Sequence, residues 1–433
     1  MRRIQWGEEN AMSDLDKLPF AGEKVFKSAE EKVSPILDNV RHHGDIALKE
    51  YTKKFDFVDL DAEDISVPER EIQGALESLT SDVRDALLLA EERIRAFHEA
   101  CLPKEIEFVP APGERFILRP IQLERVGLYV PGGRAAYPST VLMSAIPAKA
   151  AGVKEIIMCS PPNRKGAIAR SVLAAAALSG VTRIFRVGGA QAIGAMAYGT
   201  ITIAKVDKIV GPGNIFVSAA KRLVRNVTEV DKDAGPSEVV VVLDDSRHAE
   251  WAAADLLAQA EHDPAAMAVG VAVGTKVADQ LEAEVERQVA TALRREVISD
   301  ALKDQGAIVE VATREEALAV ADRLAPEHLE LMVEHPGEAA AGIRNAGAIL
   351  CGPWSAAPFG DYLAGPNHVL PTGKTARFAS PLGVFDFLKW SSITELGPEA
   401  ASRLAGPAAA LADLEGFPAH ARSLRLRASD LPR

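Results

Sequence analysis

Helix-spaced apolar residues characterise the first part of the chain. Between residues 23 and 98, apolar side chains recur three or four positions apart, as at Val33, Ile36, Leu37 and Val40. This spacing places them on one face of an amphipathic helix. The pattern therefore predicts a helical scaffold for this segment, with its charged positions facing water.

From Arg125 onward, short apolar runs alternate with alanine-rich stretches. The runs predict strands at residues 126–130, 155–159, 183–187 and 208–210. The stretches between and after them predict helices at residues 139–150, 167–178, 190–198 and 214–224. A repeated strand–helix unit of this kind calls for a parallel sheet with helices on both faces.

A second strand–helix series begins at residue 239. We expect its strands at residues 239–243, 267–273, 308–311 and 329–333, and helices around Gln259, at 276–293 and at 314–324. The chain is therefore predicted to be an α/β protein with two doubly wound units. Beyond Pro381 the sheet signal fades into residues 384–389, and a helical pattern follows at 398–414. We treat the tail, which carries His420, as a separate small element.

Composition limits the class of protein. At 433 residues, with 48% hydrophobic and 25% charged positions, the chain is expected to be globular with more than one domain. Its net charge of −12 opposes binding to nucleic acid or to anionic membrane surfaces. The three cysteines are far apart and form no CxxC motif, and the N-terminus has no signal-like apolar region. A cytoplasmic location is the expectation.

Oxygen and nitrogen ligands for a metal ion are spread over the second half of the chain. Gln259 and His262 are three residues apart, so a helix would place them on the same side. Such a pair is also common on a solvated helix face. Asp361, in a segment flanked by glycine and proline, and His420 would complete a set suited to zinc, or less selectively to manganese or cobalt.

Glycine-rich turns follow three predicted strands of the first series. They begin at Pro131, Gly188 and Gly211. Glycine at this edge of a parallel sheet lets a phosphate approach the backbone at a helix N-terminus. None of the three turns reads GxGxxG, however, and no acidic residue stands at the distance where a Rossmann unit binds ribose. Dinucleotide binding and purely structural turns therefore both remain open on spacing alone.

An acid and a base are adjacent at Glu327 and His328, where a predicted helix gives way to a strand. Imidazole is suited to accept a hydroxyl proton near neutral pH, and a partly buried carboxylate can activate water. The alternative is a surface turn with a solvated pair. His368 and Glu415 are further candidates for binding a polar substrate.

With these residues assembled, the chain resembles the histidinol dehydrogenase family along nearly its whole length. The segments that carry the resemblance are residues 126–133, 205–214, 234–238, 259–263, 326–329, 365–372 and 415–422. The resemblance implies an oxidoreductase that uses NAD and zinc, with one zinc ion per subunit.

The resemblance also implies roles for individual residues. Zinc would be bound by Gln259, His262, Asp361 and His420, and the acid–base chemistry would be done by Glu327 and His328. Substrate would be held by these six together with Ser237, His368 and Glu415. The residues implied to contact NAD are Tyr129, Gln191 and Asn214.

The architecture implied is a homodimer of two incomplete Rossmann-like doubly wound domains with small terminal extensions. The expected parts are an N-terminal arm (1–22), a discontinuous zinc and substrate domain (23–127 with 238–381), an NAD-binding domain (128–237) and a tail that crosses to the partner (382–433). Active sites would then be shared between subunits.

The reaction implied is the oxidation of L-histidinol through L-histidinaldehyde to L-histidine with two NAD molecules, the last steps of histidine biosynthesis. Related enzymes that oxidise other small polar alcohols, such as sulfonated diols, are the nearest alternative. A zinc hydrolase with purely structural glycine turns, and a noncatalytic small-molecule binding protein, are more distant ones.

Overall fold

A computed structural model describes residues 1–16, 23–132, 136–232 and 235–429. The chain divides into two compact units. Unit 1 comprises Met1–Cys101 and Glu124–Phe387, and unit 2 comprises Leu102–Leu123 and Leu388–Arg433. Each unit is therefore built from two separate stretches of sequence.

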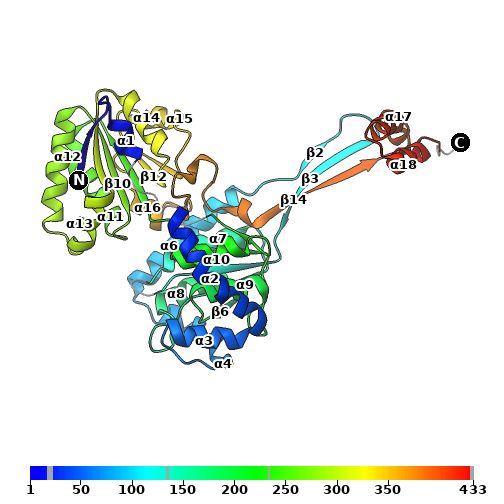
Figure 1. The fold of residues 1–433 in the computed structure, drawn as a ribbon, viewed down its shortest axis with the longest axis horizontal. Helices are drawn as coiled ribbons and strands as arrows, with labels where there is room; N and C mark the ends of the chain where they lie inside the picture. Colours follow the sequence, from blue (N-terminus) through cyan, green and yellow to red (C-terminus); the bar gives the residue numbers. More distant parts are fainter. Residues whose placement is uncertain (17–22, 133–135, 233–234, 430–433) are drawn as a thin grey trace. The chain divides into compact units, whose positions relative to one another are not determined.

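The first sheet of unit 1 has six parallel strands in the order β1-β11-β10-β9-β12-β13. Figure 1 labels two of its strands, β10 and β12. Their bounds are β1 Arg2–Gln5, β9 Glu238–Leu243, β10 Met267–Val273, β11 Gly306–Val311, β12 His328–Met332 and β13 Ala348–Cys351. Every residue of β9, with sequence EVVVVL, is buried, as expected for a strand covered on both faces.

Helices cover both faces of this sheet. The α-helices of this part are α1 Ala11–Asp16, α11 Ala249–Ala260, α12 Thr275–Val289, α13 Arg295–Gln305, α14 Arg314–Leu324, α15 Pro336–Ala341 and α16 Ala357–Tyr362. One core cluster joins alternate β9 residues to α11, α12 and α13, and a second joins the others to α1, α14 and α15. Short 3-10 helices lie at Ser246–His248, Thr375–Arg377 and Val384–Phe387.

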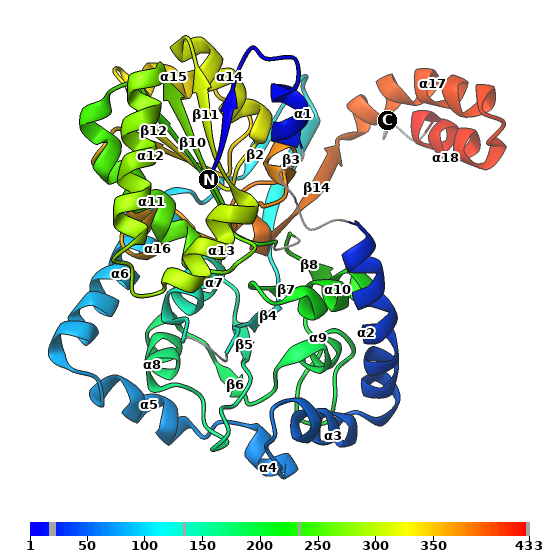
Figure 2. The ribbon, with the colours of Figure 1, turned by 60° about the vertical axis from the view of Figure 1, so that its left-hand side comes forward.

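The second sheet of unit 1 has five parallel strands in the order β6-β5-β4-β7-β8 (Figure 2). The strands are β4 Arg125–Tyr129, β5 Glu155–Cys159, β6 Arg183–Phe185, β7 Lys208–Val210 and β8 Glu229–Val230. Counted along the chain, this is the order 3-2-1-4-5 of a Rossmann unit, whose crevice lies where the strand order reverses, between β4 and β7.

The helices around the five-stranded sheet come partly from the N-terminal segment. They are α2 Glu23–His43, α3 Asp45–Phe55, α4 Ala62–Ile65, α5 Glu69–Glu77, α6 Ser81–Ala100, α7 Pro138–Ala150, α8 Arg170–Ser179, α9 Gly189–Tyr198 and α10 Ile215–Val224. Helix α2 packs against α9 and α10, α5 against α8, and α6 against α7. The expected division of the chain into four parts stays a prediction. That division groups residues 23–127 with the six-stranded sheet, whereas α2, α5 and α6 pack against helices of the five-stranded sheet.

Unit 2 is an antiparallel sheet followed by a helical hairpin. Its strands, in the order β14-β3-β2, are β2 Ile106–Phe108, β3 Glu114–Gln122 and β14 Leu388–Leu396, and its helices are α17 Pro398–Leu414 and α18 Pro418–Ser429. All nine residues of β14 pair with β3, from Leu388 opposite Gln122 to Leu396 opposite Glu114.

The α/β class and the two parallel sheets expected from the sequence are confirmed. Most expected strands and helices are present within a few residues. Across the described ranges, no helix is long and apolar enough to cross a membrane.

Candidate active site

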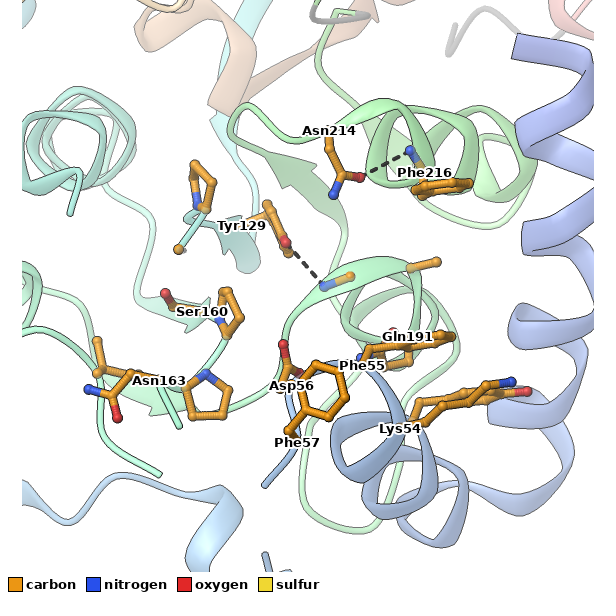
Figure 3. A pocket seen from close by; sticks show the side chains of 18 of the residues that line it. Lys54, Phe55, Asp56, Phe57, Tyr129, Ser160, Asn163, Gln191, Asn214 and Phe216 are labelled. Carbon is orange, nitrogen blue, oxygen red and sulfur yellow. Dashed lines mark hydrogen bonds between the residues drawn. The ribbon is translucent and has the colours of Figure 1, made fainter. Parts of the chain in front are cut away.

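A cavity of about 1170 Å³ opens at the carboxyl edge of the five-stranded sheet. Tyr129, Gln191 and Asn214, the three expected NAD contacts, all line it (Figure 3). Tyr129 ends β4, Gln191 lies in the first turn of α9, and Asn214 is the N-cap of α10. From the sequence, the glycine-rich turns could either bind a dinucleotide or serve only as tight connections. In the structure these turns border a cavity large enough for a nucleotide ligand.

Local contacts fix the polar groups of this cavity. The Gly189 N–H donates to the Tyr129 hydroxyl at 3.1 Å, and burial raises the pKa of that hydroxyl to about 12, so it stays neutral. The Asn214 side-chain oxygen accepts from Phe216 N–H at 3.0 Å and Val217 N–H at 3.2 Å. This cap positions the N-terminus of α10 at the cavity, where backbone N–H groups favour an anion.

Gln191 is the polar side chain that most needs a ligand. It is 1% exposed, and neither its amide oxygen nor its amide nitrogen has a hydrogen-bond partner within the described part of the chain. A buried amide left in this state is costly unless something in the cavity completes its bonds.

The turn between β7 and α10 is held by buried charges. Gly211 has φ +112°, and a Cβ there would meet the Tyr129 carbonyl oxygen at 2.1 Å, so only glycine fits. Its N–H donates to Asp231 Oδ2 at 2.7 Å, and its carbonyl accepts from the Lys221 ammonium, which is paired with Asp231. The Lys221 and Asp231 side chains are only 4% and 2% exposed.

A second group of residues gathers at the amino edge of the six-stranded sheet. His328 begins β12, and its Nδ1 lies 3.6 Å from Glu327 Oε2 while its Nε2 lies 3.9 Å from Asp361 Oδ1. His368 Nδ1 lies 3.8 Å from the same Asp361 oxygen and 2.9 Å from the Asp361 carbonyl. Glu327 and His328 are each 6% exposed, which excludes the alternative of a solvated surface pair.

Glu238, at the start of β9, braces this acid–base pair. Its N–H donates to Glu327 Oε2 at 2.9 Å, and the Glu327 N–H donates to Glu238 Oε2 at 3.3 Å. Glu238 also accepts from Gly373 N–H at 2.7 Å, and its carbonyl lies 3.3 Å from His328 Nδ1. Burial first, and then the Glu327 charge, raise the pKa of Glu238 to about 8. The sequence analysis assigned this residue no role.

The histidines of the cluster are shifted in opposite directions. Burial disfavours protonation of His328, but the charge and hydrogen bond of Glu327, and then Asp361, outweigh it and raise the pKa to about 9. For His368, burial prevails over Asp361 and lowers the pKa. The cluster therefore combines one imidazole that retains a proton with one that stays neutral.

A further pair of acids lies behind His328. Glu330, two residues along β12, is 1% exposed and accepts from Ala357 N–H at 2.6 Å. Burial first, and then Asp255 on α11, raise its pKa well above the ordinary value, and burial raises that of Asp255 as well. Both shifts disfavour the ionised forms of this pair, which limits the negative charge beside His328. No sequence spacing pointed to this pair.

The expected metal ligands are distributed unevenly. Gln259 is 6% exposed in the last turn of α11, and its amide nitrogen has no hydrogen-bond partner among the described residues. His262 was expected on the same helix, but α11 ends at Ala260 and His262 is exposed in the turn that follows. Asp361 belongs to the cluster above, and His420 is exposed on α18 in unit 2.

Within the described residues, no group of three or more His, Cys, Asp or Glu side chains is arranged so that it could hold a metal ion. Two of the expected metal ligands in unit 1, Gln259 and Asp361, nevertheless suit a metal ion. Gln259 offers a buried amide whose assignment of oxygen and nitrogen can be reversed, and Asp361 offers a carboxylate, both ligand types that zinc accepts. Of the remaining expected substrate residues, Ser237 is half-buried just before β9, and Glu415 is exposed after α17 in unit 2.

Comparisons with known proteins cover both units. A family model described as histidinol dehydrogenase matches residues 21–428. The chain is 47% identical to the histidinol dehydrogenase of Nitrosomonas europaea over 428 residues, and 47% identical to that of Aquifex aeolicus over 431 residues, covering 99% of each chain in both cases. The crystal structure of histidinol dehydrogenase from Elizabethkingia anophelis matches with a TM-score of 0.93 at 33% identity, covering 99% of this chain and 98% of that one.

Proposed function

We propose, from the premise that the chain belongs to the histidinol dehydrogenase family, that it oxidises L-histidinol to L-histidine through L-histidinaldehyde, reducing two NAD molecules. Family membership makes it an NAD-dependent oxidoreductase of an alcohol and an aldehyde. The observation that carries the proposal is the buried cluster of Glu327, His328, Asp361 and His368. It combines two carboxyl groups, of Glu327 and Asp361, with two imidazoles, of His328 and His368.

Two oxidations require two kinds of proton transfer. In the first, His328 accepts the proton of the substrate hydroxyl while the carbinol carbon transfers hydride to NAD, leaving an aldehyde. In the second, Glu327 accepts a proton from water, and the hydroxide adds to the aldehyde carbon to form the hydrate anion. That carbon then transfers hydride to a second NAD, leaving the carboxylic acid of the product, which releases its proton to water to become the carboxylate. Glu238 holds both side chains in place through its backbone N–H and carbonyl, and its carboxyl group accepts a hydrogen bond from the Glu327 backbone N–H.

We infer that zinc is bound by Gln259, His262, Asp361 and His420. The unpartnered buried amide of Gln259 and the carboxylate of Asp361 support this set. A bound zinc ion holds and orients polar groups of a substrate. His328 must be neutral to act as a base, but the charge of Asp361 helps to keep it protonated. A cation bound beside Asp361 would offset that charge, which fits the proposed role of His328.

Chelation tests the metal separately from the cofactor. The expected ligands in unit 1 belong to the six-stranded half, whereas the NAD cavity is at the five-stranded sheet. After treatment with a strong chelator and measurement of the metal content, we expect turnover to be lost and the Kd for NAD to change little. Full turnover with no metal present would exclude the zinc assignment.

We propose that two chains form a homodimer in which unit 2 completes the partner's site. Unit 2 carries two expected site residues, Glu415 and His420. Several of its apolar side chains are exposed, among them Phe108 at 61%, Leu411 at 63% and Leu414 at 83%. Apolar groups gathered on a small unit favour burial against another chain.

The cytoplasmic location stays a prediction.

The activity itself is tested with L-histidinol and NAD. We expect histidine and two equivalents of NADH for each histidinol consumed. A relative specialised for another alcohol would reduce NAD with a sulfonated diol and not with histidinol. A zinc hydrolase would produce no NADH with either, and that result would overturn the proposal.

A further inference from the structure

Asp56 is an acidic residue at the NAD cavity to which the sequence analysis gave no role. It follows the last residue of α3, where its N–H donates to the Thr52 carbonyl at 2.9 Å, and it lines the same cavity as Tyr129 and Gln191. Figure 3 shows its side chain beside Phe57, reaching toward the space below Tyr129. The carboxyl group thus enters the cavity from a segment outside the five-stranded sheet.

One oxygen of the Asp56 carboxyl has no hydrogen-bond partner among the described residues. This oxygen, Oδ2, is buried. Burial alone raises the pKa of this group to about 6, with no neighbouring cation lowering it, and at neutral pH the group is mostly ionised. A buried carboxylate oxygen without a hydrogen bond is costly, so the position of Oδ2 favours a ligand that donates one.

Three basic side chains, Lys32, Lys54 and Arg164, also line the cavity, and two of them are held against aromatic rings. Lys54 Nζ lies 5.3 Å from the centre of the Phe55 ring, and the Arg164 guanidinium lies 5.8 Å from that of Phe57. Both arrangements are cation–π contacts. Among the ion pairs of the described residues, none joins Asp56 to any of these three side chains, so the carboxylate is available to a ligand in the cavity.

The backbone next to Asp56 is also unusual. Phe57 has φ +60°, a left-handed conformation that is rare for an aromatic residue, and its side chain is 72% exposed. Strained backbone at a bulky residue persists where the surroundings hold it, and it is concentrated at ligand sites. The sharp turn after α3 therefore adds an independent indication that this corner of the cavity serves a ligand.

The five-stranded sheet lacks an acid where a Rossmann unit carries one. In that fold an acidic residue after the second strand binds the ribose 2′-hydroxyl of NAD, and a basic residue there accepts the 2′-phosphate of NADP. Here the second strand in chain order is β5, and residues 160–164, which follow it and line the cavity, read Ser-Pro-Pro-Asn-Arg. This wall therefore carries a basic residue, Arg164, whose guanidinium is stacked on Phe57, and no acid. The carboxylate that this wall lacks is present in the same cavity at Asp56.

We propose that Asp56 accepts hydrogen bonds from the adenosine ribose hydroxyls of NAD and excludes the 2′-phosphate of NADP. The inference rests on the proposed NAD site at this cavity. It assigns cofactor selection to the turn after α3 and not to the sheet, so a residue of the N-terminal helices performs the task that the missing acid performs elsewhere.

The test compares nucleotides and variants by their Kd, measured by calorimetry on the full chain with its metal bound. Asp56→Asn keeps the size of the side chain and removes its charge. We expect wild type to bind NAD roughly 100-fold more tightly than NADP, because like charges repel in a partly buried site. In Asp56→Asn, NAD should bind about 10-fold more weakly, and the preference over NADP should shrink by about 10-fold or more.

Asp59→Asn is the matched control. Asp59 has the same charge three residues further on, is half-exposed in an ion pair with Lys53 at 2.6 Å, and does not line the cavity. Its NAD and NADP affinities should stay within about twofold of wild type. Asp56→Ser, a second variant, should show the same loss of preference as Asp56→Asn, and thermal unfolding checks that each variant is folded.

A nucleotide lacking the hydroxyl locates the contact. NAD with a 2′-deoxyadenosine should bind wild type about 10-fold more weakly than NAD, but Asp56→Asn nearly as well as NAD, because the partner of the missing hydroxyl is already gone. Equal losses in both proteins, or an unchanged NAD to NADP ratio in Asp56→Asn, would overturn the assignment while leaving NAD binding intact. If wild type binds no NAD at all, the proposed function fails together with it.

Discussion

Glu327 and His328 are neighbours in the chain, yet their surroundings assign them different tasks. The pKa of His328 is raised to about 9 by Glu327 and then by Asp361, which lies beside it. The Glu327 carboxylate accepts a hydrogen bond from the Glu238 backbone N–H. We expect Glu327→Gln to slow oxidation of supplied histidinaldehyde by about 100-fold and to slow the alcohol step less, since only the second oxidation needs activated water. His328→Asn should impair proton removal from the alcohol. Single-turnover rates with each substrate decide this, and equal losses on both in Glu327→Gln would refute the division.

His98 gives a second prediction at this scale. It is 2% exposed on α6, its Nε2 has no hydrogen-bond partner among the described residues, and burial lowers its pKa to about 4. An unfolded chain takes up this proton near pH 6.5, so folding stability falls as the pH drops from about 6.5 toward 4. We expect His98→Leu to remove ~1 kcal/mol of this acid-dependent loss, allowing for partial solvation. Melting temperatures at pH 7 and pH 5 measure it, and an identical shift in both proteins would contradict it.

The sequence showed some site residues and hid others for a physical reason. Glu327 and His328 are adjacent, so a carboxylate beside an imidazole is visible without a fold. Asp56 and Glu238 acquire their environments only when distant segments meet, and no local spacing reports that. The helical spacing of Gln259 and His262 was partly misleading, because α11 ends between them.

At the scale of elements, the buried pair of Lys221 on α10 and Asp231 after β8 fixes the Gly211 turn. Lys221→Met leaves a buried carboxylate without its cation and should cost about 3–5 kcal/mol of unfolding free energy. Asp231→Asn leaves the ammonium unpaired and should cost a similar amount. The double variant carries no uncompensated charge, so it should be more stable than Lys221→Met alone. Denaturant unfolding compares the three, and simple additivity would contradict the paired-charge account.

Element types were predictable where one pattern dominated. Runs such as that of β9 are apolar at nearly every position, which only a strand buried on both faces requires. The partner of an amphipathic helix is harder to predict, because its apolar stripe specifies burial but not the surface that covers it. The packing of α2 on α9 and α10 is an example, and it differs from the expected grouping.

At the scale of the whole molecule, the proposed dimer makes a quantitative prediction. His262→Ala disables unit 1 and His420→Ala disables unit 2 of the same chain. If unit 2 serves the partner, a heterodimer of the two variants has one intact site of its two. Random exchange makes half of the dimers heterodimers, so activity should recover to roughly a quarter of wild type. Absence of recovery, although heterodimers are shown to form, would rule out the shared site.

The pairing of β1 with β11 also affects how the chain is made. Ile4 lies opposite Val309 in the parallel register, and Leu118 of β3 lies opposite Ser392 of β14. A ribosome adds roughly 5–20 residues per second, so each of these early strands waits for tens of seconds before its partner emerges. Neither can complete its sheet on a short nascent chain. The two sequence-distant pairings thus delay completion of the two sheets until β11 and β14 have been made. A chain interrupted before residue 388 would leave an edge of β3 without the strand that covers it.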